Sequence, residues 1–366
     1  MIAAGAGHRI GGGCGSGVAR TTEAQRAPGG EDEAVMGRAA DEVAIGLLGD
    51  TMLGRGVGWE LQFGEAAEPW DPELRALAAS LDAIVCNLEC CVSLRGTPTS
   101  LIPGKPFFFR APPAAVGALE AIGVRAVTLA NNHALDFGAC GLADTVTALA
   151  AAGIAAAGAG PDRRAARHAA VVQAAGRRVA VVAATDHPVE YAATPSGWGV
   201  AYADLRQGPP EWLVREIGAA HEQCDLVIAS PHWGPNMTVG PAEWQRRAAS
   251  ALQDAGADLV AGHSAHMFHG VGWTRAGPIL YDLGEALDDY RVDPKLRNDL
   301  GILAIWRPGS ASAQLELVGL RLEYARTALA VDADAEWIAA RLQRACSEHG
   351  TCVTRIAEQR FRVEPA

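Results

Sequence analysis

The sequence lacks several features that would place it in a common protein class. None of its eight cysteines forms a Cys-x-x-Cys pair, which argues against a zinc knuckle or a redox dithiol. No cluster of Lys and Arg stands out, and the formal net charge of -11 disfavours a nucleic-acid partner. No apolar stretch has the length of a signal peptide or membrane anchor, so we expect a cytoplasmic protein with no membrane partner.

The length of 366 residues suits one large α/β domain with appendages. Residues 1–40 are rich in Gly, Ala and Arg without a helical or strand period, which predicts a disordered leader. Residues 41–325 are expected to form the catalytic domain. Residues 326–366 are expected to form a helical appendage packed on that domain.

From residue 43 onward, short apolar runs alternate with Ala-rich stretches of helical length, a pattern typical of strands joined by crossover helices. We expect strands at 43–48, 83–87, 125–130, 154–158, 225–230 and 257–261. We expect helices at 71–81, 113–122, 140–152, 209–222, 241–255 and 333–347. A hairpin signal at Ala175-Gly176-Arg177 and shorter strand-like pieces after residue 266 complete the pattern. It predicts an α/β fold of two packed sheets with helices outside.

Polar side chains gather where five of the apolar runs end. Ligands in open α/β sheets bind beyond the carboxyl ends of strands, so these side chains are expected to converge. A divalent ion needs carboxylates to offset its charge and neutral imidazoles or amides to complete its shell. That mixture is supplied by Asp50, Glu89, Asn132, His232, His263 and His266. The residue types do not separate calcium, manganese and zinc.

Two His–carboxylate pairs are candidates for proton transfer. His133 and Asp136 are three residues apart, and pairing would fix the imidazole tautomer and raise its basicity, although Asp136 could equally cap a following helix. A second pair could join a site histidine, for which we favour His266, to Asp288, Asp289 or Asp299, for which we favour Asp289.

Two residues are candidates for substrate binding. Arg55 lies five residues after Asp50 in a Gly-rich loop and could hold a carboxylate. Trp233 could line an apolar groove, although most tryptophans pack in a core.

In their order, these motifs resemble those of the calcineurin-like metallophosphatase superfamily and, within it, the CapA-type poly-γ-glutamate synthesis proteins. The matching segments are Gly-Asp-Thr-Met-Leu-Gly-Arg (49–55), Asn-Leu-Glu (87–89), Ala-Asn-Asn-His-Ala-Leu-Asp-Phe-Gly (130–138), His-Trp-Gly (232–234) and Gly-His-x-x-His (262–266). The resemblance covers residues 43–306 and implies an α/β/β/α sandwich.

The resemblance also implies roles for single residues. Asp50, Glu89 and His266 would face one metal position. A second position would be faced by Glu89, Asn132, His232 and His263. His133 would be the acid/base residue beside the metal. One departure matters: the Asp-x-His usual in the first motif is Asp50-Thr51-Met52 here, so one imidazole ligand is absent.

Three classes of function compete. The absent imidazole weakens a two-metal phosphoesterase, and the absent anchor weakens an exported polyglutamate-processing protein. We therefore expect an isomerase resembling the lasso-peptide epimerases, which inverts a Cα centre at the C-terminal residue of a ribosomal precursor peptide. The alternative is a CapA-like metal-dependent hydrolase, either a phosphoesterase or a poly-γ-glutamate processing enzyme. A non-enzymatic binding module is the third class.

Overall fold

The computed structural model describes residues 43–366, apart from residue 67 and residues 310–313. The leader predicted at residues 1–40 lies outside the described residues. From residue 43 on, the described residues belong to one compact unit. Within these ranges, no helix combines the length and the apolar character needed to cross a bilayer.

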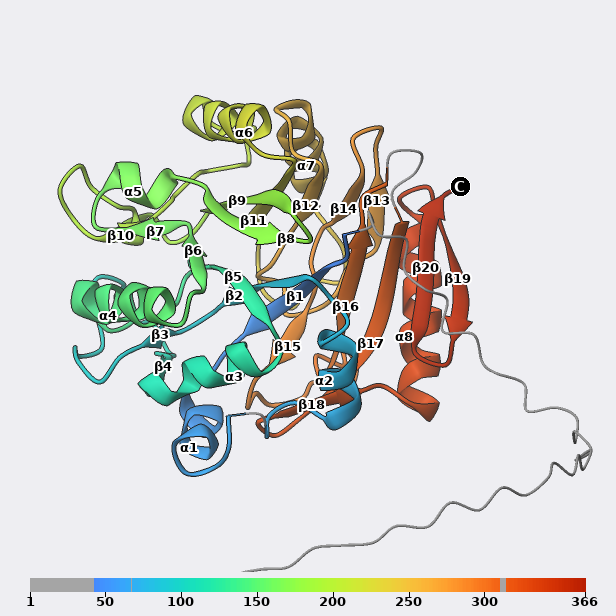
Figure 1. The fold of residues 1–366 in the computed structure, drawn as a ribbon, viewed down its shortest axis with the longest axis horizontal. Helices are drawn as coiled ribbons and strands as arrows, with labels where there is room; N and C mark the ends of the chain where they lie inside the picture. The colour runs from blue at the N-terminus through green and yellow to red at the C-terminus, as the bar shows by residue number, and fades with distance from the viewer. Residues whose placement is uncertain (1–42, 67, 310–313) are drawn as a thin grey trace, which may run out of the picture. The chain divides into compact units, whose positions relative to one another are not determined.

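The larger sheet has ten strands in the order β19-β20-β17-β16-β1-β2-β5-β6, with β15 beside β1 and β18 beside β17 (Figure 1). Strands β1, β2, β5 and β6 run parallel, whereas β16 and β17 are antiparallel. The strands are β1 (Ile45–Thr51), β2 (Ala83–Leu88), β5 (Val124–Thr128), β6 (Ala155–Ala157), β15 (Glu285–Leu287), β16 (Leu300–Arg307), β17 (Gln314–Glu323), β18 (Arg326–Leu329), β19 (Thr351–Ala357) and β20 (Arg360–Pro365).

The second sheet has six strands in the order β13-β14-β12-β11-β9-β8. Its strands are β8 (Ala170–Ala174), β9 (Arg177–Thr185), β11 (Leu226–His232), β12 (Leu259–Ala261), β13 (Val271–Trp273) and β14 (Pro278–Leu280). Two small ladders pair β3 (Cys91–Val92) with β4 (Arg110–Ala111) and β7 (Ala159–Gly160) with β10 (Gly199–Val200).

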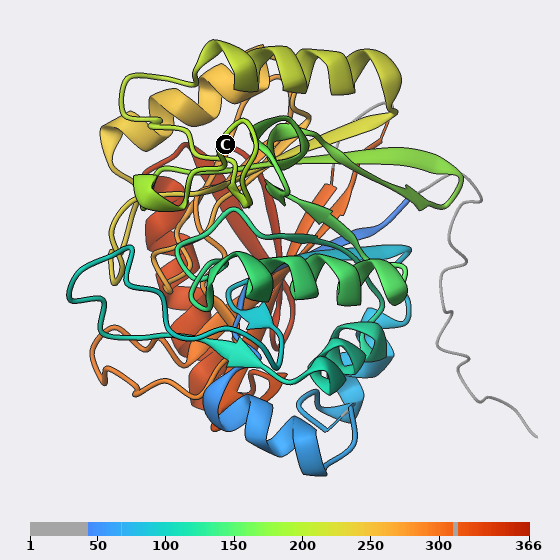
Figure 2. The ribbon, with the colours of Figure 1, turned by 90° about the vertical axis from the view of Figure 1, so that its left-hand side faces the viewer.

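Helices cover the outer faces of both sheets, except that the last helix packs Ile338 and Leu342 into the core cluster between the sheets. They are α1 (Arg55–Phe63), α2 (Pro72–Ala78), α3 (Val116–Ala121), α4 (Gly138–Ala151), α5 (Arg163–Arg167), α6 (Glu211–Gln223), α7 (Glu243–Asp254) and α8 (Asp332–Ser347). Figures 1 and 2 show α6 and α7 over the second sheet and α3 and α4 over the larger one. Leu119 and Leu142 pack with Val127 of the larger sheet, and Ile217 and Leu252 share a core cluster with the second.

Alternation along the strands places the core between the sheets. In β1, Ile45 and Leu47 join a buried cluster with Val181 and Ile228 of the second sheet, whereas Leu48 faces the helices. Because both faces of β1 are covered, its residues before Gly49 are all apolar and every residue of the strand is buried. The predicted α/β sandwich of two packed sheets, a calcineurin-like fold, is confirmed.

The C-terminal segment differs from the expected helical appendage. Helix α8 is present, but β18, β19 and β20 continue the larger sheet, and β20 pairs with β17. Phe361 and Val363 of β20 are buried, whereas Arg362 and Glu364 between and beside them are exposed. This period of two is that of a half-buried strand, so residues 326–366 are an integral edge of the domain.

Candidate metal centre

The carboxyl ends of parallel strands from both sheets meet at one place. The larger sheet contributes Asp50 near the end of β1 and Glu89 directly after β2. The second sheet contributes His232 at the end of β11 and His263 after β12, and these two histidines are bridge partners. All four side chains are buried, as expected where parallel strands end beneath loops.

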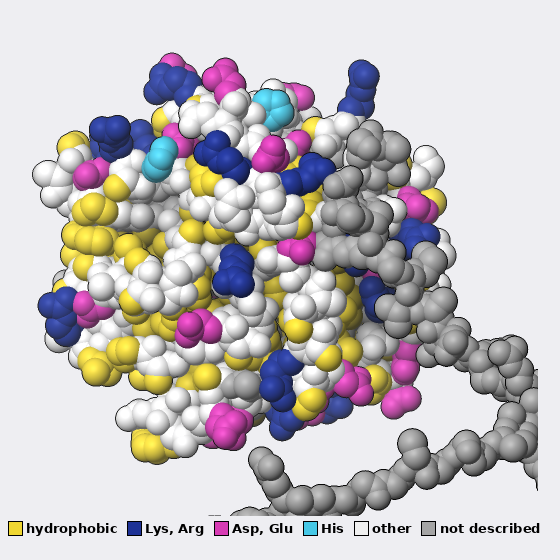
Figure 3. All heavy atoms as spheres, viewed as in Figure 1, with side chains coloured by type: hydrophobic (Ala, Val, Ile, Leu, Met, Phe, Trp, Pro, Cys, Tyr) yellow, Lys and Arg dark blue, Asp and Glu magenta, His cyan; other side chains and the backbone are white. Residues whose placement is uncertain are grey.

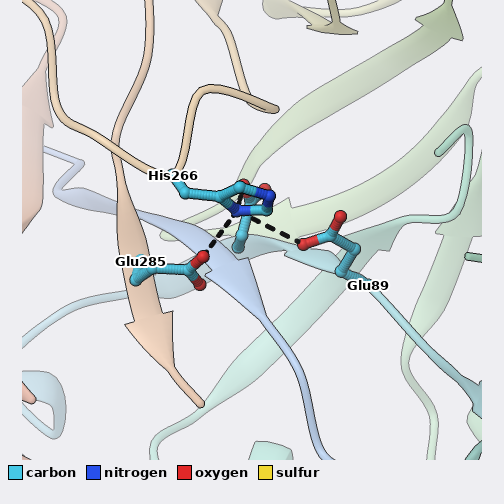
Figure 4. A group of neighbouring side chains, drawn as sticks. Glu89, His266 and Glu285 are labelled. Atoms are coloured by element: carbon cyan, nitrogen blue, oxygen red, sulfur yellow. Dashed lines mark ion pairs between the residues drawn. The ribbon is translucent and has the colours of Figure 1, made fainter. Parts of the chain in front are cut away.

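Four side chains form the tightest group. Asp50, Glu89, His266 and Glu285 each offer one ligand atom, and these atoms lie within 4.8 Å of one another. The Nδ1 atom of His266 lies 2.5 Å from Glu285 Oε1, 3.2 Å from Asp50 Oδ2 and 3.9 Å from Glu89 Oε2. Figure 4 shows the imidazole between the two glutamates. Such a group of oxygens and one nitrogen can hold a divalent cation.

Several buried polar atoms around this group have no hydrogen-bond partner, at a cost of about 1–3 kcal/mol for each such atom. They are both carboxylate oxygens of Glu89, Glu285 Oε2, Asn132 Oδ1, His232 Nε2 and His263 Nδ1. All are electron-pair donors of the kind that metals bind, so a cation is the ligand that satisfies them together. The residues present therefore fit a divalent metal.

Hydrogen bonds from neighbouring groups orient His263 and Asp50, so that their ligand atoms face the centre of the group. His263 Nε2 lies 3.1 Å from Ser230 Oγ, so the other ring nitrogen, Nδ1, is directed toward Asp50 Oδ1 at 3.6 Å. The Asn87 amide donates to Asp50 Oδ1 at 2.7 Å, and the backbone N–H of Ser264 donates to Asp50 Oδ2 at 3.3 Å. Such outer contacts orient metal ligands and fix their tautomers.

Burial and charge set the protonation of these groups. Burial lowers the pKa of His263 to about 4 and that of His232 well below its ordinary value, so both imidazoles are neutral. Burial opposes the charged form of Asp50, but His266 and the other two histidines hold its pKa below the ordinary value. Burial also opposes protonation of His266, yet Glu285 and Glu89 raise its pKa well above the ordinary value.

His133 forms the predicted pair with Asp136 beside this group. His133 Nδ1 lies 2.6 Å from Asp136 Oδ2, and its Nε2 lies 3.9 Å from Glu89 Oε1. Asp136 also accepts hydrogen bonds from the backbone N–H of Phe109 at 2.7 Å and from the Tyr191 hydroxyl at 3.1 Å. Helix α4 begins at Gly138 without a side-chain cap, so Asp136 orients His133 and does not cap the helix.

Lys105 adds a cation to this arrangement. Its Nζ donates to the Asn132 backbone oxygen at 2.7 Å and lies 3.2 Å from Asp136 Oδ1. Burial lowers the pKa of His133 to about 4, although the Asp136 carboxylate opposes the shift. The imidazole is therefore neutral, with the nitrogen opposite Asp136 directed toward Glu89. It can accept a proton at that nitrogen.

A cavity of about 300 Å³ opens onto His133 and His266. Its walls include Phe109, whose ring stacks on His133 with centroids 4.0 Å apart, and Tyr290. The guanidinium of Arg55 lies 5.7 Å from the Phe109 ring centroid and 5.8 Å from that of Tyr290. The cavity thus combines aromatic walls with a cation that can bind a carboxylate.

Two of the predicted site residues, Asp289 and Trp233, do not make the contacts that were predicted for them. Asp289 does not meet an imidazole: its Oδ1 lies 3.3 Å from Arg55 Nε and its Oδ2 accepts from the Gly56 N–H at 2.9 Å. His266 contacts Glu285 instead of Asp289. Trp233 has no exposed surface for a substrate, because it packs in the core and its indole N–H donates to the Tyr281 carbonyl at 2.9 Å.

Other site residues were not singled out in the sequence. Glu285 does not follow the end of a strand, because it is the first residue of β15. Parallel pairing of β15 with β1 places it opposite Asp50. Asp186 and His187 follow β9, so the same search extended to that strand would have found them. His187 Nδ1 is ion-paired with Asp186, and its ring centroid lies 5.3 Å from that of His232.

The chain is similar to known proteins of one bacterial family. The family model described as bacterial capsule synthesis protein PGA_cap matches residues 44–290. A probable polyglutamine synthesis accessory protein of Mycobacterium tuberculosis is 33% identical over 318 residues, which cover 81% of each chain. The capsule biosynthesis protein CapA of Bacillus anthracis is 29% identical over 69% of this chain and 61% of its own length. The PGA biosynthesis protein CapA of Bacillus subtilis is 27% identical over 68% and 64%.

These relatives overturn the expectation of an isomerase. They are named for capsule and polyglutamine or PGA synthesis, and not for epimerisation. The favoured pair of His266 with Asp289 is not formed, because His266 pairs with Glu285 and Asp289 pairs with Arg55. The interpretation as a peptide epimerase is therefore wrong.

Proposed function

The chain belongs to the bacterial capsule synthesis protein family, and on that premise we propose that it is a metal-dependent hydrolase of a poly-γ-glutamate-type polymer. The observation that carries the proposal is the neutral imidazole of His133, hydrogen-bonded to Asp136, which faces a cluster of ligand atoms without hydrogen-bond partners at one cavity. The relatives are named for polyglutamine or PGA synthesis, and the resemblance to the CapA-type proteins suggests poly-γ-glutamate as the polymer.

Two sets of residues would hold metal. Asp50, Glu89, His266 and Glu285 would bind one divalent cation. The partnerless atoms of Asn132, His232 and His263 would serve a second position together with Glu89. When bound, such ions supply Lewis acidity toward a carbonyl oxygen and toward water.

His133 would move the proton in this hydrolysis. A water oxygen adds to the γ-amide carbon, the carbon–nitrogen bond breaks, and the products are a new γ-carboxyl group and a free α-amine. Nε2 of His133 takes the proton that the attacking water loses and returns it to the departing amine nitrogen. Asp136, held by Lys105, Tyr191 and Phe109, orients the ring and stabilises its protonated state.

Arg55 would orient the polymer. Each residue of a γ-linked glutamate chain carries one free α-carboxylate, and the Arg55 guanidinium lies at the cavity wall between two aromatic rings. Asp289 holds the Arg55 side chain in this position through Nε, which leaves the terminal nitrogens for the substrate.

The test is cleavage of a γ-linked glutamate polymer by protein loaded with manganese or zinc. Chain length and newly formed amino termini are measured together. Replacing His133 with Ala should reduce turnover by about 100-fold or more while metal content is kept, as expected for loss of a general acid/base group. His221→Ala, at an exposed position on α6, is the matched control and should match the unmodified protein.

Two outcomes contradict the proposal. If the metal-loaded protein leaves the polymer intact but releases phosphate from simple phosphate esters, the chain is a phosphoesterase. If His133→Ala cleaves the polymer at the unmodified rate, His133 does not transfer the proton.

A further inference from the structure

We propose that a groove between α5 and α6 binds carboxylates of the polymer at a distance from the metal centre, an inference that rests on the proposed function for the identity of the chain. The groove encloses about 800 Å³ and is lined by Arg163, Arg164 and Arg167 from α5 and Arg215 from α6, with Trp212 at its side. It shares no lining residue with the cavity beside His133.

The positive charge of this groove is not neutralised from within. Among the described residues, Arg163, Arg164 and Arg167 form no ion pair with a carboxylate, and Arg215 pairs with Glu211. Two acids also line the groove, fewer than the four arginines, and each has a partner of its own. Asp162 accepts from the Ala165 N–H at 2.8 Å, and Glu216 Oε1 accepts from the Ala169 N–H at 2.8 Å and lies 2.9 Å from His168 Nδ1. In a chain of net charge -11 this is a local excess of cations.

The arginines are held close together. The Arg167 guanidinium lies 4.5 Å from the centroid of the Trp212 ring, so the indole fixes it at the wall of the groove. Burial and then the charges of Arg163 and Arg215 lower the pKa of Arg167. Like charges held together in this way are relieved by an anionic ligand, and guanidinium groups bind carboxylates in a bidentate manner.

The fold assembles this site from distant segments. Three of the four arginines lie within α5, and the fold brings Arg215 of α6 beside them. Figure 3 shows basic and histidine side chains gathered over the corner formed by α5 and α6, at the upper left. Several separate guanidinium groups suit a polymer with one carboxylate per residue better than a single small anion.

One loop joins the groove to the metal centre. It begins with Asp186 and His187 beside His232, and its Tyr191 donates to Asp136. Further along, the carbonyl of Thr194 accepts from the Arg163 N–H at 2.7 Å, and Pro195 lines the groove. An extended polymer that follows this loop can contact both sites at once.

The test is binding of a defined γ-linked glutamate oligomer to metal-free protein by calorimetry, so that the result does not depend on turnover. The double variant Arg164→Glu and Arg167→Glu should bind at least about tenfold more weakly, since it removes two cationic hydrogen-bond donors and adds two charges that repel a carboxylate. The matched control is Arg344→Glu with Arg362→Glu, an equal change of net charge at exposed positions on α8 and β20. It should retain the original affinity.

Equal affinity of the groove variant and the unmodified protein would overturn the inference, and so would an equal loss in the control. A polyphosphate of the same length that binds more tightly, with the same sensitivity to Arg164 and Arg167, would overturn the assignment to carboxylates. Failure of polymer cleavage with retained, groove-dependent binding would contradict only the proposed hydrolysis.

Discussion

Glu285 changes the chemistry of the first metal position. The Asp-x-His motif of the wider metallophosphatase superfamily, which the first motif resembles, has an imidazole where this chain has Met52. The Met52 sulfur is buried and accepts a hydrogen bond from the Gly54 N–H at 3.0 Å. Glu285 reaches the same group of ligands from β15 and contacts His266. Exchange of a neutral nitrogen for a charged oxygen favours harder cations such as manganese or calcium over zinc.

Replacing Glu285 with Gln tests this interpretation. The variant keeps the shape of the side chain but removes the charge, so we expect the affinity for manganese to fall by at least about tenfold, with a smaller loss for zinc. Metal titration followed by calorimetry measures both. Glu316→Gln is the control, since Glu316 is also buried but pairs with Arg307 and Arg360 at the far part of the sheet. Unchanged manganese affinity in Glu285→Gln would remove this residue from the ligands.

The secondary-structure elements that carry the site were predictable because their signals are local. Five strand ends followed by polar residues were visible in the sequence, and β1, β2, β5, β11 and β12 lie within a few residues of the expected ranges. Long apolar runs of this kind follow from burial on both faces.

The remaining elements have weak local signals. Strand β15 has three residues and opens with a charged one, so its position depends on pairing with β1 and not on its own sequence. Lys105 lies in an irregular segment, and only the tertiary fold brings it to Asp136. The C-terminal hairpin alternates apolar and charged residues, a signal that the adjoining helix pattern obscured.

The C-terminal hairpin is expected to stabilise the whole domain. Phe361 is buried in the inter-sheet core with Leu317 of β17, and Phe361→Ala should lower the free energy of unfolding by about 3–5 kcal/mol, as for other large-to-small core changes. Denaturant unfolding of the metal-loaded protein measures this loss. Ile356→Ala, in the same hairpin but 40% exposed, should change it by less than about 0.5 kcal/mol. Equal effects of the two would show that the hairpin is an appendage after all.

At the scale of the whole molecule, the metal centre is divided between the sheets. Asp50, Glu89 and Glu285 belong to the larger sheet, whereas His232 and His263 belong to the second. A cation bound there, as proposed, would link the two halves of the fold as well as serve the chemistry. Because binding to the folded state alone stabilises that state, chelation should lower the melting temperature.

Metal binding should also release protons and strengthen as the pH rises. In the metal-free protein, burial and the nearby Asp50 raise the pKa of Glu89, and the Glu285 carboxylate raises that of His266 against the effect of burial, so both shifts favour the protonated form of the group. A cation needs both groups deprotonated, so about one or two protons should leave for each ion bound. Calorimetry in buffers of different ionisation enthalpy counts them, with Glu316→Gln as the control of unchanged stoichiometry. Affinity that is constant or falls between pH 6 and pH 8 would show that these groups are not the ligands.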